Sequence, residues 1–272
     1  MRTFRWTASL AAVALAIVGC SSSTVTPTAA PSSAAKTAAS ANPAVKTLTI
    51  AYEESCQVEL IAPSGERILI DVADATLLTS PAKASDILLT THLHSDHYNQ
   101  AFEQSFPGKK ITNETTDLTV GDINIKSIAA SHDDSPISAD QPTNHIFIIE
   151  FNGFKIVHGG STGQLKLTPE QLSAIGDNVD IGALVLRNVG GSDPASNKAI
   201  DIVNQINPKI LIPTHSTLEY SKAGGKAWKA TYSSNETVAI PHDQLPAQTT
   251  MLFMGQLATS YGAILNAPET NW

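Results

Sequence analysis

Four side chains that can bind a metal ion lie within the six residues from His92 to His97, which read His-Leu-His-Ser-Asp-His. Imidazole nitrogens and carboxylate oxygens are typical ligands of zinc and of neighbouring transition metals, often in near-tetrahedral sites. Histidine clusters of this density are a composition typical of metal binding. The run therefore predicts a metal centre rather than a solvated loop that contains three histidines by chance.

Three further histidines each follow or end a segment that is predicted to be a strand. They are His132 after residues 125–130, His158 at the end of residues 154–158, and His215 after residues 210–214. Active-site groups on α/β scaffolds are usually held by loops at strand ends, where a rigid sheet fixes them. The repeated order of strand and then histidine predicts one site that is assembled from several strand ends.

The elements that must position these residues are mostly short strands. Apolar or alternating segments bounded by turn signals predict a β-rich domain from Val45 onward. The expected strands are Thr47–Tyr52, Gln57–Ile61, Arg67–Val72, Ile87–Thr91, Leu118–Val120, Ile123–Ile128, Ile146–Phe151, Phe154–His158, Ala183–Leu186, Ile210–Ile212 and Thr250–Phe253. Two β-rich halves with helices outside them are expected, in one layered α/β domain.

Two segments carry helical signals. Thr168 precedes Pro169 as an N-cap residue would, and this predicts a helix that continues over Gln171–Ile175. Apolar residues at helical spacing predict a second helix over Ala195–Ile206. The segment Leu218–Ser234, which contains three aromatic residues, is expected to be a loop near the site.

Residues 91–97 resemble the signature motif of the metallo-β-lactamase-fold hydrolases. Supporting segments match in the same order along the chain: Ile68–Asp71, Ser131–His132, Phe154–Thr162 and Lys209–Ser216. The resemblance covers roughly residues 47–255, and its spacing is most similar to the branch that includes ascorbate-6-phosphate lactonase. It implies the four-layer αββα sandwich of that family, an α/β fold, as a single domain over residues 45–272.

The resemblance also implies two sets of metal ligands. The first set would be His92, His94 and His132, and the second would be Asp96, His97 and His215. These two sets imply two zinc ions with a water or hydroxide between them. Zinc lowers the pKa of a bound water to about 7, so a hydroxide nucleophile is expected at neutral pH. Asp96 would accept a hydrogen bond from this nucleophile and orient it as a catalytic residue.

One position departs from the family pattern. Ser161 stands where most members have an aspartate that bridges the two metals, and a neutral hydroxyl is a much poorer ligand. Either both metals bind at a less negative site that favours an anionic substrate group, or the protein holds one metal. Asp71 and His158 are expected to orient the metal ligands through hydrogen bonds without binding the metal themselves. A strand-end cap and a hydrogen-bonded strand-end histidine are the simpler interpretations of these two residues.

The N-terminus carries the pattern of an export signal. Arg2 and Arg5 precede the apolar run Leu10–Val18, and Ile17–Cys20 resembles the lipobox of bacterial lipoproteins. We expect a signal peptide over residues 1–19, a lipidated Cys20, and a Ser/Ala/Thr/Pro-rich tether over residues 20–44. The chain is then an exported lipoprotein, anchored to a membrane of the bacterial cell envelope. An ordinary secretory signal is the alternative.

Composition limits the remaining classes of function. The 272 residues carry a net charge of −8 and contain no Lys/Arg-rich run, so no nucleic-acid partner is expected. The two cysteines provide no disulfide framework, and Cys56 would remain as a lone thiol. The expected function is zinc-dependent hydrolysis of a small, possibly anionic ester, lactone or phosphodiester. A non-catalytic envelope lipoprotein that binds metal or ligand, and a β-lactam hydrolase, are the alternatives.

Overall fold

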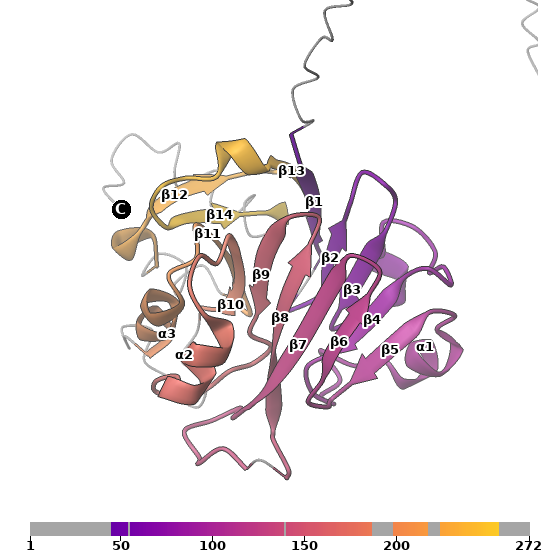
Figure 1. Ribbon diagram of the computed structural model, residues 1–272, viewed down its shortest axis with the longest axis horizontal. Helices are drawn as coiled ribbons and strands as arrows, with labels where there is room; N and C mark the ends of the chain where they lie inside the picture. The colour runs from indigo at the N-terminus through magenta and orange to yellow at the C-terminus, as the bar shows by residue number, and fades with distance from the viewer. Residues whose placement is uncertain (1–44, 54, 139, 187–197, 217–223, 256–272) are drawn as a thin grey trace, which may run out of the picture. The chain divides into compact units, whose positions relative to one another are not determined.

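The computed structural model describes residues 45–53, 55–138, 140–186, 198–216 and 224–255 (Figure 1). The predicted signal peptide, Cys20 and the tether lie outside the described residues, and these expectations stay predictions. Within the described ranges, no helix has the length and apolar character that a membrane crossing requires.

The first of two β-sheets, here called sheet A, has six strands. In spatial order they are β13 (Thr237–Pro241), β1 (Thr47–Tyr52), β2 (Val58–Ile61), β3 (Arg67–Ile70), β4 (Ile87–Thr90) and β5 (Lys109–Thr112). Strands β1, β2 and β3 pair antiparallel, whereas β3, β4 and β5 pair parallel. The C-terminal ends of β3 and β4 therefore meet at one edge of the sheet.

The second sheet, sheet B, has eight strands. In spatial order they are β12 (Lys229–Tyr232), β14 (Thr250–Phe253), β11 (Ile210–Thr214), β10 (Ile181–Val185), β9 (Phe154–His158), β8 (Asn144–Phe151), β7 (Ile123–Ala130) and β6 (Asp117–Val120). Strands β6 to β9 pair antiparallel, and β9, β10, β11, β14 and β12 pair parallel.

Alternating side chains place the main core between the two sheets. Ile68 of β3 and Phe147 of β8 belong to one buried cluster that draws on both sheets. Their neighbours face outward: Leu69 packs on one outer face and Ile146 on the other. Because successive side chains of a strand point to opposite faces, these strands are apolar on both sides. Each sheet is therefore covered on its inner and its outer face.

Helices form the outer layers (Figure 1). Helix α1 (Gln100–Ser105) contributes Phe102 to the cluster outside sheet A. Helices α2 (Pro169–Ile175) and α3 (Lys198–Ile206) contribute Ile175 and Val203 to the cluster outside sheet B. The four-layer αββα architecture expected from the sequence is therefore confirmed.

Three strands, Thr47–Tyr52, Phe154–His158 and Thr250–Phe253, have the predicted bounds, and the cap of α2 at Thr168 is confirmed as a capping box. Strands β5, β12 and β13 and helix α1 were not expected. The prediction of a continuous loop over Leu218–Ser234 was wrong, because β12 lies within it. Among the described strands, β12 pairs only with β14, and its side chains are mostly exposed, so it lacks the apolar alternation that identifies a strand.

A buried ion-pair network lies on β2 and β3. Arg67 is 3% exposed and its Nη1 lies 2.9 Å from Glu59 Oε2, while its Nε lies 3.1 Å from Asp86 Oδ2. The guanidinium also donates to the main-chain oxygens of Ser80 and Pro81, at 2.9 and 3.0 Å. Both carboxylates are fully buried, so their charge is compensated by this single guanidinium and by hydrogen bonds.

Glu53, which directly follows β1, adds a carboxyl group next to Glu59. Burial, and then repulsion by the charge of Glu59, raise the pKa of Glu53 from 4.5 to about 9. Between these values the folded chain holds a proton that the unfolded chain releases, so stability falls as pH rises through this window. We expect Glu53→Gln to remove this loss and to raise the urea midpoint at about pH 8 more than at about pH 5.

The exposed Glu66 supplies the control, since Glu66→Gln should leave the pH profile of stability unchanged. A Glu53→Gln protein whose urea midpoint follows the wild-type pH profile in parallel would contradict the raised pKa of Glu53.

Candidate metal centre

The predicted metal ligands lie in loops after strands of both sheets. His92, His94, Asp96 and His97 follow β4 of sheet A, whereas His132 follows β7 and His215 follows β11 of sheet B. All six are brought together where the edges of the two sheets meet, so the order of strand and histidine in the sequence does predict one site. The structure divides the imidazoles into two adjoining groups.

The first group, the three-imidazole group, consists of His92, His94 and His132. One ring nitrogen of each lies within 4.8 Å of those of the other two. The ring centroids of His92 lie 4.6 Å from those of His94 and 5.0 Å from those of His132. Three imidazoles that converge without an intervening side chain have the composition of a three-histidine zinc site with one open position.

The protonation of His92 suits metal binding. Burial, together with the neighbouring imidazoles, lowers the pKa of His92 to about 3, so the ring is neutral. Its Nδ1 lies 3.1 Å from Thr91 Oγ1, which itself donates to Asp71 Oδ2 at 2.7 Å. The buried Nε2 has no hydrogen-bond partner among the described residues. A proton on Nδ1 leaves a lone pair on Nε2, and a cation bound among the three imidazoles would satisfy it.

The second group contains His97, His215 and Asp96. The Nε2 atoms of His97 and His215 lie 2.7 Å apart. Asp96 Oδ2 lies 3.5 Å from His215 Nε2 and 3.8 Å from His97 Nε2, although the Asp96 side chain is 49% exposed. The His92 and His97 rings are 4.0 Å apart, so the two groups adjoin. The neighbouring imidazoles outweigh the effect of burial and lower the pKa of Asp96, which is therefore a carboxylate.

Asp71 holds His97 from behind. This fully buried residue accepts hydrogen bonds from the Thr91 main-chain nitrogen and from His97 Nδ1, both at 2.7 Å. Burial would raise the pKa of Asp71, but the electrostatic interaction with His97 and these hydrogen bonds lower it. With its proton on Nδ1, His97 presents the Nε2 lone pair to the site. The contacts favour the orienting role of Asp71 over a simple strand-end cap.

The turn after β9 places Ser161 in the second group. Ser161 Oγ lies 3.0 Å from His97 Nε2, and the Ser161 nitrogen donates to Asn144 Oδ1 at 3.1 Å. Gly160 has a φ of +56°, and a Cβ there would lie 2.4 Å from Asn144 Oδ1 and 2.7 Å from Thr91 Cβ. Only glycine fits this approach of the two sheets. Ser161 therefore lies next to the second group, and its correspondence to the family aspartate stays an expectation from the sequence resemblance.

Two buried residues lie beneath this turn. His158 is completely buried, its Nε2 lies 3.0 Å from the Cys56 carbonyl oxygen, and its Nδ1 accepts from Gly160 N at 3.2 Å. Burial lowers the pKa of His158, so this ring is neutral. Sequence reasoning missed Cys56: its sulfur and one ring nitrogen each of His97 and His215 all lie within 4.8 Å of one another. The sequence indicated only that this cysteine lies between the first two predicted strands.

Backbone strain is concentrated around the second group. Ser55, Asp71 and His215 have φ values of +52°, +53° and +48°, a region that costs non-glycine residues about 1 kcal/mol or more. The His215 nitrogen donates to the Ser55 oxygen at 2.9 Å, which ties a loop of sheet B to one of sheet A. Such strained positions persist where the surrounding contacts fix a functional geometry.

Asp71→Asn is expected to weaken metal binding at the second group by about 10- to 100-fold. Asparagine keeps the size of the side chain and tolerates positive φ, but it has one acceptor oxygen where Asp71 has two: Oδ1 accepts from the Thr91 main-chain nitrogen, and Oδ2 accepts from the Thr91 hydroxyl and from His97 Nδ1. Competition with a chromophoric chelator measures the affinity. Asp74→Asn, at the exposed cap of the 3₁₀ helix Ala75–Leu77, is the control and should bind metal like the wild type. Equal affinities for the two variants would contradict the orienting role.

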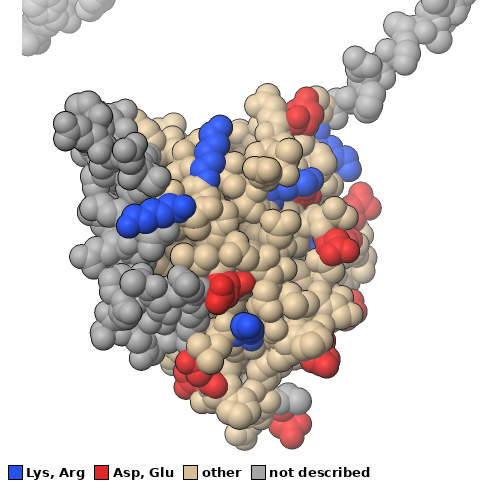
Figure 2. All heavy atoms as spheres, turned by 90° about the vertical axis from the view of Figure 1, so that its left-hand side faces the viewer, with Lys and Arg blue, Asp and Glu red and all other residues tan. Residues whose placement is uncertain are grey.

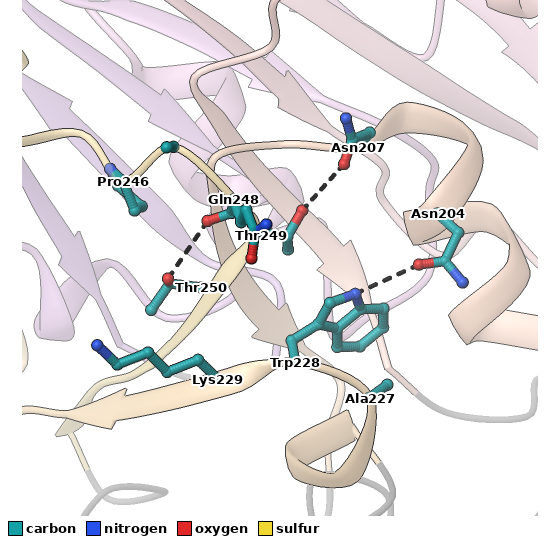
Figure 3. Close-up of a pocket in the computed structure, with 10 residues that line it drawn as sticks. Asn204, Asn207, Ala227, Trp228, Lys229, Pro246, Gln248, Thr249 and Thr250 are labelled. Atoms are coloured by element: carbon teal, nitrogen blue, oxygen red, sulfur yellow. Dashed lines mark hydrogen bonds between the residues drawn. The ribbon is translucent and has the colours of Figure 1, made fainter.

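A cavity of about 700 Å³ lies away from these imidazoles (Figure 3). It is next to the N-terminal ends of β11 and β14, whereas His215 follows the C-terminal end of β11. Figure 3 shows Trp228 donating to Asn204 and Thr249 donating to Asn207 at its wall. Among its lining residues, only Lys229 is charged, and no metal-binding side chain is present. This cavity is therefore not part of the candidate metal centre.

The face of the molecule in Figure 2 carries mixed charge. On its described part, the Lys and Arg side chains lie among Asp and Glu side chains instead of gathering into one basic patch. The expectation that the chain binds no nucleic acid rests on the sequence charge and stays a prediction.

Comparison with known proteins identifies related folds. A family model described as a beta-lactamase superfamily domain matches residues 50–215. A protein from Thermotoga maritima, described as a Zn-dependent hydrolase of the metallo-beta-lactamase superfamily, has a TM-score of 0.55 and 19% identity, over 76% of this chain and 98% of its own. A metallo hydrolase from the archaeon Ignicoccus hospitalis has a TM-score of 0.51 and 17% identity, over 71% of this chain and 98% of its own. No curated protein sequence matches the chain.

Proposed function

Because the chain belongs to the metallo-β-lactamase superfamily, whose fold it shares with metal-dependent hydrolases, we propose that it hydrolyses a small ester, lactone or phosphodiester. One observation carries the proposal: the buried His92 Nε2 has no hydrogen-bond partner among the described residues, in a ring that converges with those of His94 and His132. An unpaired buried acceptor of this kind is costly unless an ion or substrate satisfies it.

The donor set suits zinc. His92, His94 and His132 would hold one ion, and His97, His215 and Asp96 the other. When bound, zinc supplies Lewis acidity and a nucleophile at neutral pH. Asp96 is half exposed and carries a second oxygen, so it can orient an attacking water and accept its proton.

The substrate class follows from charge. Position 161 carries a neutral hydroxyl, so among the described residues the carboxylates next to these imidazoles are Asp96 at the open side and the buried Asp71 behind His97. Two divalent ions in such a surrounding would leave a net positive centre that attracts a carboxylate or phosphate group of the substrate. Similarity to the spacing of the ascorbate-6-phosphate lactonase branch supports a lactone or ester that carries such a group.

Metal content and turnover test the proposal together. We expect purified protein to contain zinc by elemental analysis, and to hydrolyse members of a panel of lactones, aryl esters and phosphodiesters until a chelator is added. Nitrocefin in the same panel separates a β-lactam hydrolase from the other classes. Bound metal without turnover of any substrate would favour the non-catalytic alternative, and absence of a transition metal would reject the proposal.

We further propose that the protein is exported and anchored to the cell envelope by a lipid on Cys20. The support is the basic, then apolar N-terminal sequence that ends at Ile17–Cys20, followed by a Ser/Ala/Thr/Pro-rich segment. Cys20→Ala should move the protein from the membrane fraction to the soluble or unprocessed fraction and abolish labelling with radioactive palmitate. Persistent palmitate labelling of this variant would exclude Cys20 as the lipid site.

A further inference from the structure

Cys56 lies between β1 and β2, and its side chain reaches the second metal group. The residue is completely buried, and its sulfur donates to the Gly160 carbonyl oxygen at 3.4 Å. The same sulfur lies within 4.8 Å of one ring nitrogen of His97 and of His215. It therefore approaches the second group from beneath the turn in which Ser161 replaces the family aspartate.

We propose that Cys56 supplies a thiolate ligand to the second metal, in place of the carboxylate that is missing at position 161. The inference rests on the proposed metal-dependent function. Cysteine sulfur together with histidine nitrogen is a typical ligand combination of zinc. On binding, the S–H bond breaks, the metal–sulfur bond forms and the proton passes to solvent. The thiolate adds one negative charge, and two divalent ions with Asp96 and Cys56 as their anionic ligands would still leave a net positive centre.

The surroundings fix the position of the sulfur. His158 Nε2 lies 3.0 Å from the Cys56 carbonyl oxygen, and the adjacent Ser55 oxygen accepts from the His215 nitrogen at 2.9 Å. One contact ties the cysteine backbone to the end of β9, and the other ties its neighbour to the loop after β11. The thiol of sheet A and the imidazole of sheet B are thus held next to each other before any metal binds.

The donor count gives the two metals different roles. Cys56, His97 and His215 converge as three donors, and we expect the half-exposed Asp96, whose Oδ2 lies 3.5 Å from His215 Nε2, to complete the four that are typical of a closed zinc site. The three-imidazole group has three donors and leaves a position open for substrate or water. We therefore expect the second metal to be the more tightly held of the two, although it lacks the bridging aspartate.

Cobalt substitution of the full-length protein tests the ligand directly. Thiolate coordination to cobalt(II) produces a charge-transfer band in the near ultraviolet that imidazole and carboxylate ligands do not produce. The wild type loaded with about two cobalt ions per chain should show this band. Cys56→Ser should lose it, and its affinity for the second ion should fall at least about 100-fold. Cys20→Ala removes the other cysteine of the chain and should keep the band, as the matched control.

A rescue variant separates loss of a ligand from loss of the fold. Cys56→Ser combined with Ser161→Asp restores a charged donor by the family route, so it should bind about two ions again and show no thiolate band. A wild type that binds two ions and hydrolyses substrate without the band overturns this inference alone. A Cys56→Ser protein with unchanged affinity for both ions does the same. A wild type that binds no transition metal overturns both this inference and the proposed function.

Discussion

Hydrolysis by a His94→Ala protein is expected to fall by at least about 10³-fold in kcat/KM. His94 belongs to the three-imidazole group, which leaves the open position at which a substrate would meet its nucleophile. Its side chain is exposed, so the substitution removes a ligand without creating a core cavity. Metal content should fall together with activity, while the far-ultraviolet circular dichroism spectrum should stay that of the wild type.

Leu93→Ala provides the matched control for this loop. Leu93 lies next to His94, is 53% exposed and has no metal-binding atom, so its truncation should leave both kcat/KM and metal content within a few-fold of the wild type. If His94→Ala retained wild-type turnover, the reaction centre would have to lie outside the three-imidazole group.

Arg67→Met is expected to lower the free energy of unfolding by about 3–5 kcal/mol, measured by urea denaturation. Methionine fills part of the space, but it leaves the carboxylates of Glu59 and Asp86 buried without their guanidinium partner. The main-chain oxygens of Ser80 and Pro81 lose their donors as well. The cost therefore comes mainly from uncompensated buried charge and not from lost packing.

A partly exposed ion pair gives the comparison. Lys110 Nζ lies 3.6 Å from Glu103 Oε1, and both side chains are partly in contact with solvent. Lys110→Met should change the free energy of unfolding by less than about 1 kcal/mol. Similar losses in the two variants would show that burial of the Arg67 network does not determine its contribution.

Much of the site could be predicted from the sequence because its signals are local. The run His92–His97 is contiguous, His132 follows a strand whose first residues alternate between buried apolar and exposed polar side chains, and His215 follows a strand that is buried on both faces. A strand and the residue after it can be identified without knowledge of the strand's partners. The resemblance to a known family then supplied the grouping of these residues into two sets of ligands.

Contacts between distant segments were not predictable in the same way. The approach of Cys56 to His215 depends on the meeting of two sheets, and the sequence around the cysteine carries no motif for it. Helix α1 was missed because its six residues are too few to show a helical period, although Asn99 caps it. Strand β13 was missed for a different reason: it lies at the edge of sheet A and has one buried residue, Ile240, among five.

The line along which the loops of the two sheets meet also affects how resistant the protein is to proteolysis. Main-chain hydrogen bonds cross it from His145 to the Thr91 oxygen at 3.1 Å and from His215 to the Ser55 oxygen at 2.9 Å, beside the metal-binding groups. An ion that binds only the folded chain, at 100 times its dissociation constant, adds about 2.7 kcal/mol of stability. Loss of metal would remove this contribution, so the chain would unfold, and be open to proteases, more often. Metal supply would thereby control how long each molecule survives, in addition to how fast it works.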